Sequence, residues 1–192
     1  MSLPDLAIAM ALAWGAGLRA YAVIFAVGLA GAIGWVELPG YLDVLQHPAV
    51  LVASGFMTLV EFGADKVPWL DSIWDAIHSF VRIPAGAALA AMVFGDSTSA
   101  VMVAAAILGG SLAAAMHVAK SGTRATLNLS PEPFSNWAAS LSEDALVPLG
   151  LWLAFAHPLA FVAVLAALLV AAALLARLLW RGLRRLGATS ST

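Results

Sequence analysis

The sequence contains no cysteine among its 192 residues. Disulfide bonds, thiolate metal sites, iron–sulfur clusters and cysteine nucleophiles are therefore excluded. Charged residues are also scarce, at 10% of the chain, whereas a soluble domain carries about 25%. The net charge of −2 includes only nine lysines and arginines, and no nucleic-acid partner is expected.

Hydrophobic residues, by contrast, make up 62% of the chain. A soluble chain of this size could not bury so many, because its large surface needs polar groups. The sequence therefore predicts an all-α integral membrane protein in a lipid bilayer, with about six transmembrane segments. The apolar segments fall at roughly 5–35, 48–63, 82–95, 99–119, 137–156 and 158–181.

Two of these segments depart from a simple span. The first is too long for one straight helix, and Gly15 and Gly17 interrupt it, which predicts two half-helices or a strongly tilted, broken helix. The third is short and has Pro84 near its start, so it either gains length from the preceding amphipathic turns or is re-entrant.

The basic residues indicate an orientation. Every lysine and arginine except Arg19 falls on the same side of a six-span arrangement. The positive-inside rule makes that side cytoplasmic, so both termini are predicted to be cytoplasmic. Three spans in each half would make the two halves inverted relative to each other.

A short polar motif occurs twice, as Gly-Leu-Arg-Ala at 17–20 and Gly-Thr-Arg-Ala at 122–125. An arginine in lipid is costly unless it faces a partner or water, so the two copies point to a site between two repeats. We expect one membrane domain of two inverted three-helix repeats, about 1–95 and 96–181, with a short cytoplasmic tail at 182–192. A chance match in an Ala- and Gly-rich chain is the alternative.

The second copy lies in a stretch, 117–136, that is dense in hydrogen-bonding side chains. Gly122 and two prolines predict a break in the helix, and an anion between Lys120 and Arg124 would relieve their repulsion. A solvated cytoplasmic loop is the alternative interpretation. The predicted substrate-binding residues are Arg19, Lys120, Thr123, Arg124, Asn128, Ser135 and Asn136.

Four carboxylates are candidate partners of the two motif arginines. Glu61 and Asp65 are four residues apart and share a face if the helix continues. Glu143 and Asp144 lie within the fifth segment, where they are expensive unless paired or protonated. We expect these four either to neutralise the arginines or to carry a coupling proton, with a purely structural ion pair as the alternative.

A further polar face contains Asp71, Asp75 and His78, whose spacing permits a metal site. Two other interpretations stay open. One is an interfacial helix whose acids pair with Lys66 and Arg82. The other is the lining of a polar cavity. No cofactor is expected.

Motifs along nearly the whole chain carry a family resemblance. They are Gly17–Tyr21, Val60–Phe62, Asp65–Pro68, Asp71–Ser72, Trp74–Asp75, His78, Arg82–Gly86, Gly122–Ala125 and Ser130–Asn136. With them the chain resembles a bacterial and plastid membrane family catalogued as domain of unknown function four-one-two-six. The resemblance implies an all-helical membrane protein, and we expect it in a bacterial inner (plasma) membrane. It implies no activity and no catalytic residue.

Two functions from different classes follow from the residues. The preferred one is a small transporter or channel for a small anion or anionic metabolite, with proton coupling as an option and a homodimer compatible with the small size. The other is a membrane enzyme or carrier that acts on a lipid phosphate such as a polyprenyl phosphate. A structural subunit explains the charges in the spans least well, and no catalytic residue is predicted.

Overall fold

A computed structural model describes residues 2–127 and 134–189. The described residues form helices and no strands, which confirms the all-α prediction. In chain order the elements are α1 (Leu3–Ala32), the short 3-10 helix η1 (Leu42–Gln46), α2 (Pro48–Ala64), α3 (Pro68–Val93), α4 (Ser99–Leu127), α5 (Phe134–Ala156) and α6 (Pro158–Thr189).

Several helices are long and apolar enough to cross a membrane, which supports the prediction of a membrane protein. Candidate spans are Leu3–Ala32, Ile73–Val93, Ser99–Leu127 and Trp137–Ala156, and shorter apolar helices cover Pro48–Ala64 and Pro158–Leu174. The third apolar segment reaches spanning length because α3 begins at Pro68 and continues through Pro84.

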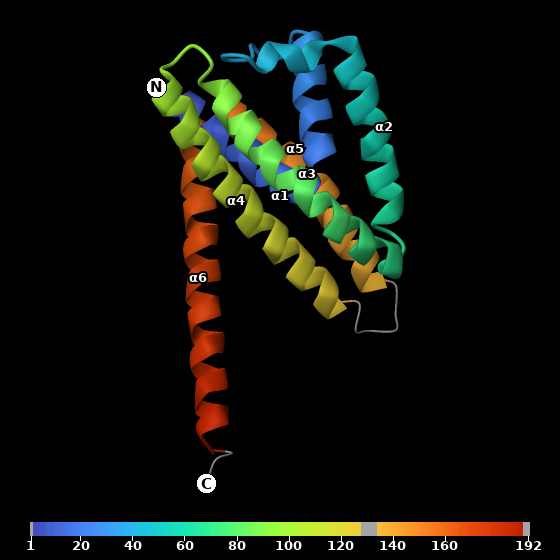
Figure 1. Cartoon of the computed structure of the whole chain (residues 1–192), viewed down its shortest axis with the longest axis vertical. Helices are drawn as coiled ribbons and strands as arrows, with labels where there is room; N and C mark the ends of the chain where they lie inside the picture. Colours follow the sequence, from blue (N-terminus) through green and yellow to red (C-terminus); the bar gives the residue numbers. More distant parts are fainter. Residues whose placement is uncertain (1, 128–133, 190–192) are drawn as a thin grey trace.

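The first apolar segment forms two half-helices, as one of its two interpretations predicted. The break lies at Arg19, whose backbone leaves the helical region with φ −149° and ψ 80°. Figure 1 shows both ends of α1 at the same end of the molecule, so α1 is a bent hairpin with Arg19 at its apex. The two arms pack on each other, since Gly15 directly faces Val23.

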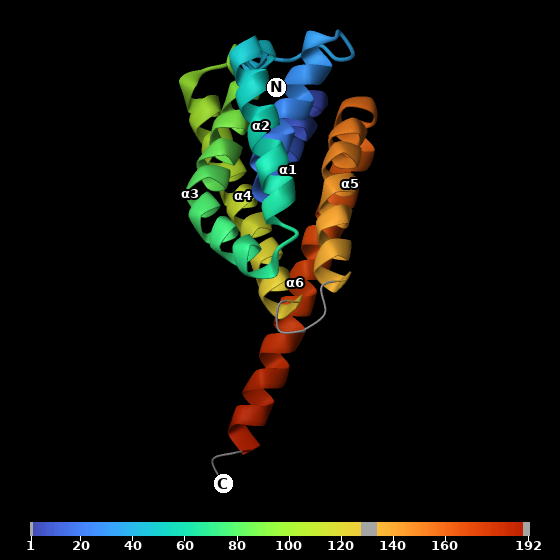
Figure 2. The same ribbon diagram turned by 90° about the vertical axis from the view of Figure 1, so that its right-hand side faces the viewer.

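The hairpin forms the centre of the fold. Helix α1 contacts every other helix, and its buried residues supply much of the apolar core. Helix α6 packs on α1 and α5 through Phe161 and Leu165, and its second half extends beyond the bundle (Figure 2). The hairpin of α1 is therefore mostly shielded from lipid by the helices around it.

The hairpin also changes the arrangement of the ends. Because α1 returns to the end where it began, the start of α1 and the end of α6 lie at opposite ends of the helical body (Figures 1 and 2). A chain that crosses six times would have both on one side. The predicted arrangement has both termini on the cytoplasmic side of six spans. The structure differs from it because Arg19 reverses the chain at the middle of the first apolar segment.

Small residues let α3 and α4 pack closely. A Cβ added to Gly109 would contact the Ala90 methyl and lie 2.8 Å from the carbonyl oxygen of Gly86. Gly17 in α1 faces α4 as closely, since a Cβ there would lie 2.7 Å from the Met116 Cβ. Membrane helices often use small residues for such close approach.

We therefore expect Gly109→Ala to lower the free energy of unfolding in detergent by about 1–3 kcal/mol, because α3 and α4 must move apart. Gly122→Ala on the same helix is the matched control, because nothing lies within 4 Å of its added Cβ. The control should leave stability unchanged or raise it by up to about 1 kcal/mol through helix propensity. Thermal melts of both variants test this, and equal melting temperatures would contradict the close packing.

Candidate functional site

Nine charged side chains meet where the apex of α1 reaches the other helices. This charge cluster comes from α1, α2, the residue that follows α2, α3, α4 and α5, and most of its members are buried. Its members are Arg19, Glu61, Asp65, Asp75, Arg82, Lys120, Arg124, Glu143 and Asp144. Buried charges need partners, and each of these side chains has at least one oppositely charged partner among the others.

Arg19 is buried and paired, as predicted. Its Nη2 lies 2.8 Å from Asp65 Oδ2 and 3.1 Å from Asp144 Oδ1. The same nitrogen donates to the Ser140 hydroxyl at 3.1 Å, and Nε lies 3.9 Å from Glu143 Oε2. Asp65, Glu143 and Asp144 were among the candidate partners, and the closest of them is Asp65.

Lys120 and Arg124 share two carboxylates. Lys120 Nζ lies 3.2 Å from Asp65 Oδ2 and 3.1 Å from Glu143 Oε2. Arg124 Nη2 lies 3.2 Å from Glu143 Oε2 and 3.8 Å from Asp65 Oδ2. The anions between the two cations of α4 are thus side chains of the protein itself.

The predicted helix break at Gly122 is wrong. Helix α4 continues to Leu127, because a single glycine does not interrupt helical hydrogen bonding when nothing competes for the backbone. Thr123 is exposed and donates to the carbonyl oxygen of Ala119 in its own helix. Among the described residues, Thr123 therefore takes no part in the charge cluster.

The cluster has two halves. The contacts around Asp65 and Glu143 form the first, and those around Arg82 form the second. This arginine donates to Glu61 Oε1 at 2.6 Å and to Asp75 Oδ1, and its Nη1 lies 3.3 Å from His117 Nδ1. Lys120 Nζ lies 3.6 Å from Asp75 Oδ1 and so connects the two halves. Glu61 thus pairs with Arg82 rather than with Arg19.

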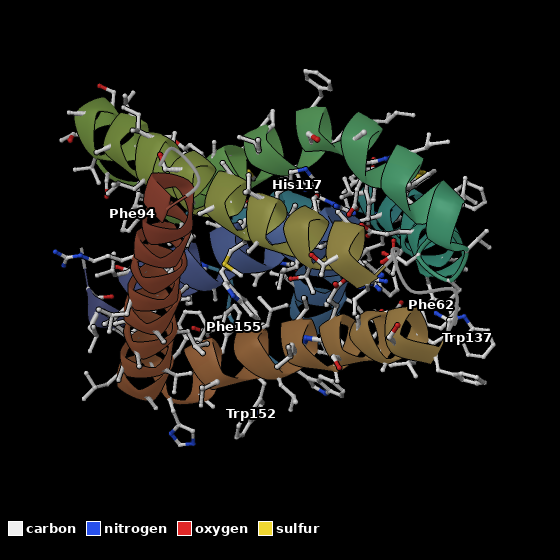
Figure 3. All side chains as sticks on the ribbon, turned by 90° about the horizontal axis from the view of Figure 1, so that it is seen from below. Phe62, Phe94, His117, Trp137, Trp152 and Phe155 are labelled. Carbon is white, nitrogen blue, oxygen red and sulfur yellow. The ribbon has the colours of Figure 1, made fainter. Side chains whose placement is uncertain are left out.

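Arg82 and His117 were not predicted as site residues. Arg82 was named only as a partner of the acids in the interfacial-helix interpretation, and it does pair with Asp75. A signal for His117 was present, since His117, Lys120 and Arg124 are spaced by three and four residues and share one helix face. In Figure 3, His117 lies between α3 and α4.

The cluster contains more acids than bases. Four basic side chains face five carboxylates in the nine residues named above. Lys66 directly follows Asp65 but is not one of these nine residues. Its ammonium lies over the Phe62 ring, and burial lowers the pKa of Lys66. With all nine groups charged, the cluster carries one excess negative charge.

Asp65 lies in the connection between α2 and α3 and, like Glu143, pairs with Arg19, Lys120 and Arg124. Burial by itself would raise its pKa, but Lys120, Arg19 and Arg124 together lower the pKa below its usual value. The carboxylate is therefore held in its charged form by three cations from two helices.

A cavity of about 310 Å³ borders the cluster between α3 and α4. Two of its polar atoms, Ser121 Oγ and Asp75 Oδ2, are buried without a hydrogen-bond partner in the part of the chain that the structure describes. Small-molecule sites are usually concave and present a few convergent polar groups. The lining residues are Asp75, Ala76, Ser79, His117, Ser121, Arg124 and Ala125.

The remaining predicted site residues lie elsewhere or are not described. Ser135 is in the first turn of α5, and its hydroxyl is buried with no partner among residues 2–127 and 134–189. Asn128 lies outside the described residues, and the Asn136 side chain is not described.

The proposed metal ligands are only partly described. His78 stacks on Trp74 with ring centroids 3.9 Å apart, and Asp75 pairs with Arg82, while the Asp71 side chain is not described. Within the described residues, no group of three or more His, Asp or Glu side chains is placed to hold a metal ion.

A comparison with known families matches residues 6–178 to the family described as Domain of unknown function (DUF4126), which confirms the resemblance. No curated protein and no solved structure matches the chain.

Proposed function

This chain belongs to the DUF4126 family, and we propose that it is a small membrane transporter that couples a small anion or anionic metabolite to a proton. The observation that carries the proposal is the shared carboxylate pair. Lys120 and Arg124 are buried within α4, and Glu143 and Asp65 occupy the positions that a bound anion would take. Arg124 also borders the cavity between α3 and α4.

Charge balance supports proton coupling. Removing one member of a buried ion pair leaves the other charge uncompensated, which costs several kcal/mol. A proton on Glu143 would weaken its hold on Lys120 and Arg124, and a monovalent anion would replace it. Proton and anion together leave the net charge of the cluster unchanged. Glu143 and Asp144 suit this role, because their side chains are 13% and 25% exposed whereas Asp65 is fully buried.

The repeated motif supports a site between two halves of the chain. Arg19 and Arg124, from the two copies, both face Asp65 and Glu143. An inverted repeat would place its two arginines around one such centre. The copies differ in backbone, since α1 bends at Arg19 and α4 is continuous, so the bent copy is the natural hinge.

Transport by the purified protein in liposomes tests this function. We expect an inward proton gradient to accelerate uptake of radiolabelled inorganic phosphate or another anion of a panel with chloride, formate and malate. Arg124→Ala should reduce the rate by about tenfold or more, because a charge-assisted contact is lost. Arg177→Ala, an exposed arginine of α6, is the matched control. Anion uptake that no proton gradient accelerates, or no uptake of any panel member, would contradict the proposal.

We place the end of the molecule that contains Lys66 and the arginine-rich end of α6 in the cytoplasm. In a bacterium the protein would lie in the inner membrane. With the bent α1, the N-terminal end of the helical body and η1 would then lie on the outer side. A homodimer is compatible with this arrangement and stays a prediction.

Single cysteines test the orientation cleanly, because the chain has none of its own. We expect Leu3→Cys and Asp43→Cys to react with an impermeant thiol reagent from outside, and Ser190→Cys only from inside, because α1 returns to its starting side. A six-crossing chain would label Leu3→Cys and Ser190→Cys from the same side. That result would contradict the hairpin.

A further inference from the structure

We infer that the cavity between α3 and α4 recognises an oxoanion that carries its own acidic hydrogen, such as dihydrogen phosphate or a phosphate monoester. The inference rests on the proposed function and names the class of its substrate. It depends on which lining groups are already used by the protein and which stay available to a ligand.

Ser79 and His117 are already used. Arg82 is always a donor, so its contact at 3.3 Å requires His117 Nδ1 to accept, and the hydrogen of the neutral ring lies on Nε2. Nε2 then donates to Ser79 Oγ at 2.9 Å. The Ser79 hydroxyl donates to the carbonyl oxygen of Asp75 or Ala76, each 3.0 Å away. Both side chains therefore line the cavity with groups whose hydrogen bonds are already made within the protein, and neither is left to bind a ligand directly.

Asp75 offers an acceptor to the ligand. Its Oδ1 is held by Arg82 and lies 3.6 Å from Lys120 Nζ. Its Oδ2 is buried and accepts no hydrogen bond from the described residues. An ionised carboxylate oxygen can only accept, so it repels an anion that has no hydrogen and binds one that has an O–H group. An unsatisfied buried acceptor of this kind is destabilising until such a donor binds.

Ser121 and Arg124 offer the complementary donors. The Ser121 hydroxyl is buried and lacks a partner in the described part of the chain, although it lines the same cavity as Asp75. Arg124 lines the cavity too and is held by Glu143 at 3.2 Å, the carboxylate that protonation would release. A ligand with one O–H end and one charged oxygen end would satisfy Asp75 and Arg124 together.

This arrangement excludes simpler anions by chemistry rather than by size. Chloride and sulfate carry no hydrogen near neutral pH, so either would meet Asp75 Oδ2 without a donor between them. The cavity of about 310 Å³ lies at the lower end of the usual range for small-molecule sites. Inorganic phosphate and the headgroup of a lipid phosphate share the required chemistry.

Equilibrium binding to the purified protein tests the inference at about pH 6, where phosphate keeps acidic hydrogens and sulfate has none. We expect unlabelled phosphate to displace radiolabelled phosphate at a concentration about tenfold or more below that of sulfate. Asp75→Asn should bring the two within about threefold, because an amide can donate to an oxygen that has no hydrogen. Equal displacement by phosphate and sulfate in the natural protein would overturn the inference.

Ser121→Ala keeps the inference testable if Asp75→Asn fails to fold. Its hydroxyl has no partner to lose, so melting should be unchanged while phosphate binding weakens by about threefold or more. Ser111→Ala is the matched control on α4, because that hydroxyl is exposed and bonds only to the carbonyl oxygen of Ile107 among the described residues. Equal phosphate affinities for Ser121→Ala and Ser111→Ala would overturn the assignment of this cavity.

The same assays distinguish inorganic phosphate from a lipid phosphate headgroup as the ligand. They also distinguish failure of the proposed transport from failure of the inferred phosphate recognition. Binding of vesicles that contain phosphatidic acid, with no specific binding of radiolabelled inorganic phosphate, would identify a lipid headgroup and contradict transport of a free solute. Selective phosphate binding without uptake into liposomes would contradict the proposed function alone. Proton-coupled anion uptake with no preference for phosphate over sulfate would contradict the inference alone.

Discussion

Arg19→Ala is expected to cost about 3–5 kcal/mol of folding free energy, the largest loss among single substitutions of the basic side chains. The guanidinium is 1% exposed and faces three carboxylates, Asp65, Glu143 and Asp144. Removing it leaves these acids with one cation fewer at the bend of α1, the helix that contacts every other helix. The measurement is chemical or thermal unfolding of the purified protein in detergent.

Arg19→Lys should recover little of this stability. The arginine uses Nη2 and Nε to reach three carboxylates and the Ser140 hydroxyl, and a single ammonium cannot match that geometry. Arg177→Ala, at an exposed position of α6, should leave melting unchanged. If Arg19→Ala melted at the same temperature as Arg177→Ala, the hairpin apex would not depend on its ion pairs.

The pairing of Arg19 was predictable from the sequence for a general reason. An arginine within an apolar segment must find a carboxylate or water, and the chain places few acids within its spans. Glu143 and Asp144 were therefore natural candidates, and both lie near Arg19. Asp65 was a candidate as well, but its contact with three cations was not predictable, because it depends on where α2 ends relative to the apex of α1.

The two copies of the Gly-x-Arg-Ala motif show why local sequence alone was insufficient. Around Arg19 the chain leaves the helix, while around Arg124 the helix continues for another turn. Gly17 faces α4 closely and Gly122 faces open space, so the surroundings decide the backbone. Similar residues therefore predicted two breaks where the structure has one.

Arg82 was named as a partner of the acids on its own helix and does pair with Asp75, whereas Glu61 and His117 reach it from α2 and α4. Glu61 and Asp75 are 21 and 7 residues before Arg82, and only the packing of α2 and α4 against α3 makes one network of them. The cavity depends on the same packing. Composition and spacing indicated polar faces, whereas which faces meet is a property of the whole bundle.

Asp65→Asn is expected to have an effect of similar size, about 3–5 kcal/mol, because it removes one of the two carboxylates that Arg19, Lys120 and Arg124 share. The effect should depend on pH in a defined direction. The three cations lower the pKa of Asp65 below its usual value of 3.8, so the folded state binds the proton more weakly than the unfolded state. Its contribution is complete above about pH 5 and is lost as the pH falls through that lowered pKa.

The difference in unfolding free energy between the natural protein and Asp65→Asn should therefore be constant from about pH 7 to pH 5 and shrink below about pH 4. Asp43→Asn, an exposed aspartate of η1, is the control and should match the natural protein throughout. A difference that stays constant down to about pH 3 would show that Asp65 is not the charged centre of the cluster, since a carboxylate held by three cations must lose that stabilisation when protonated.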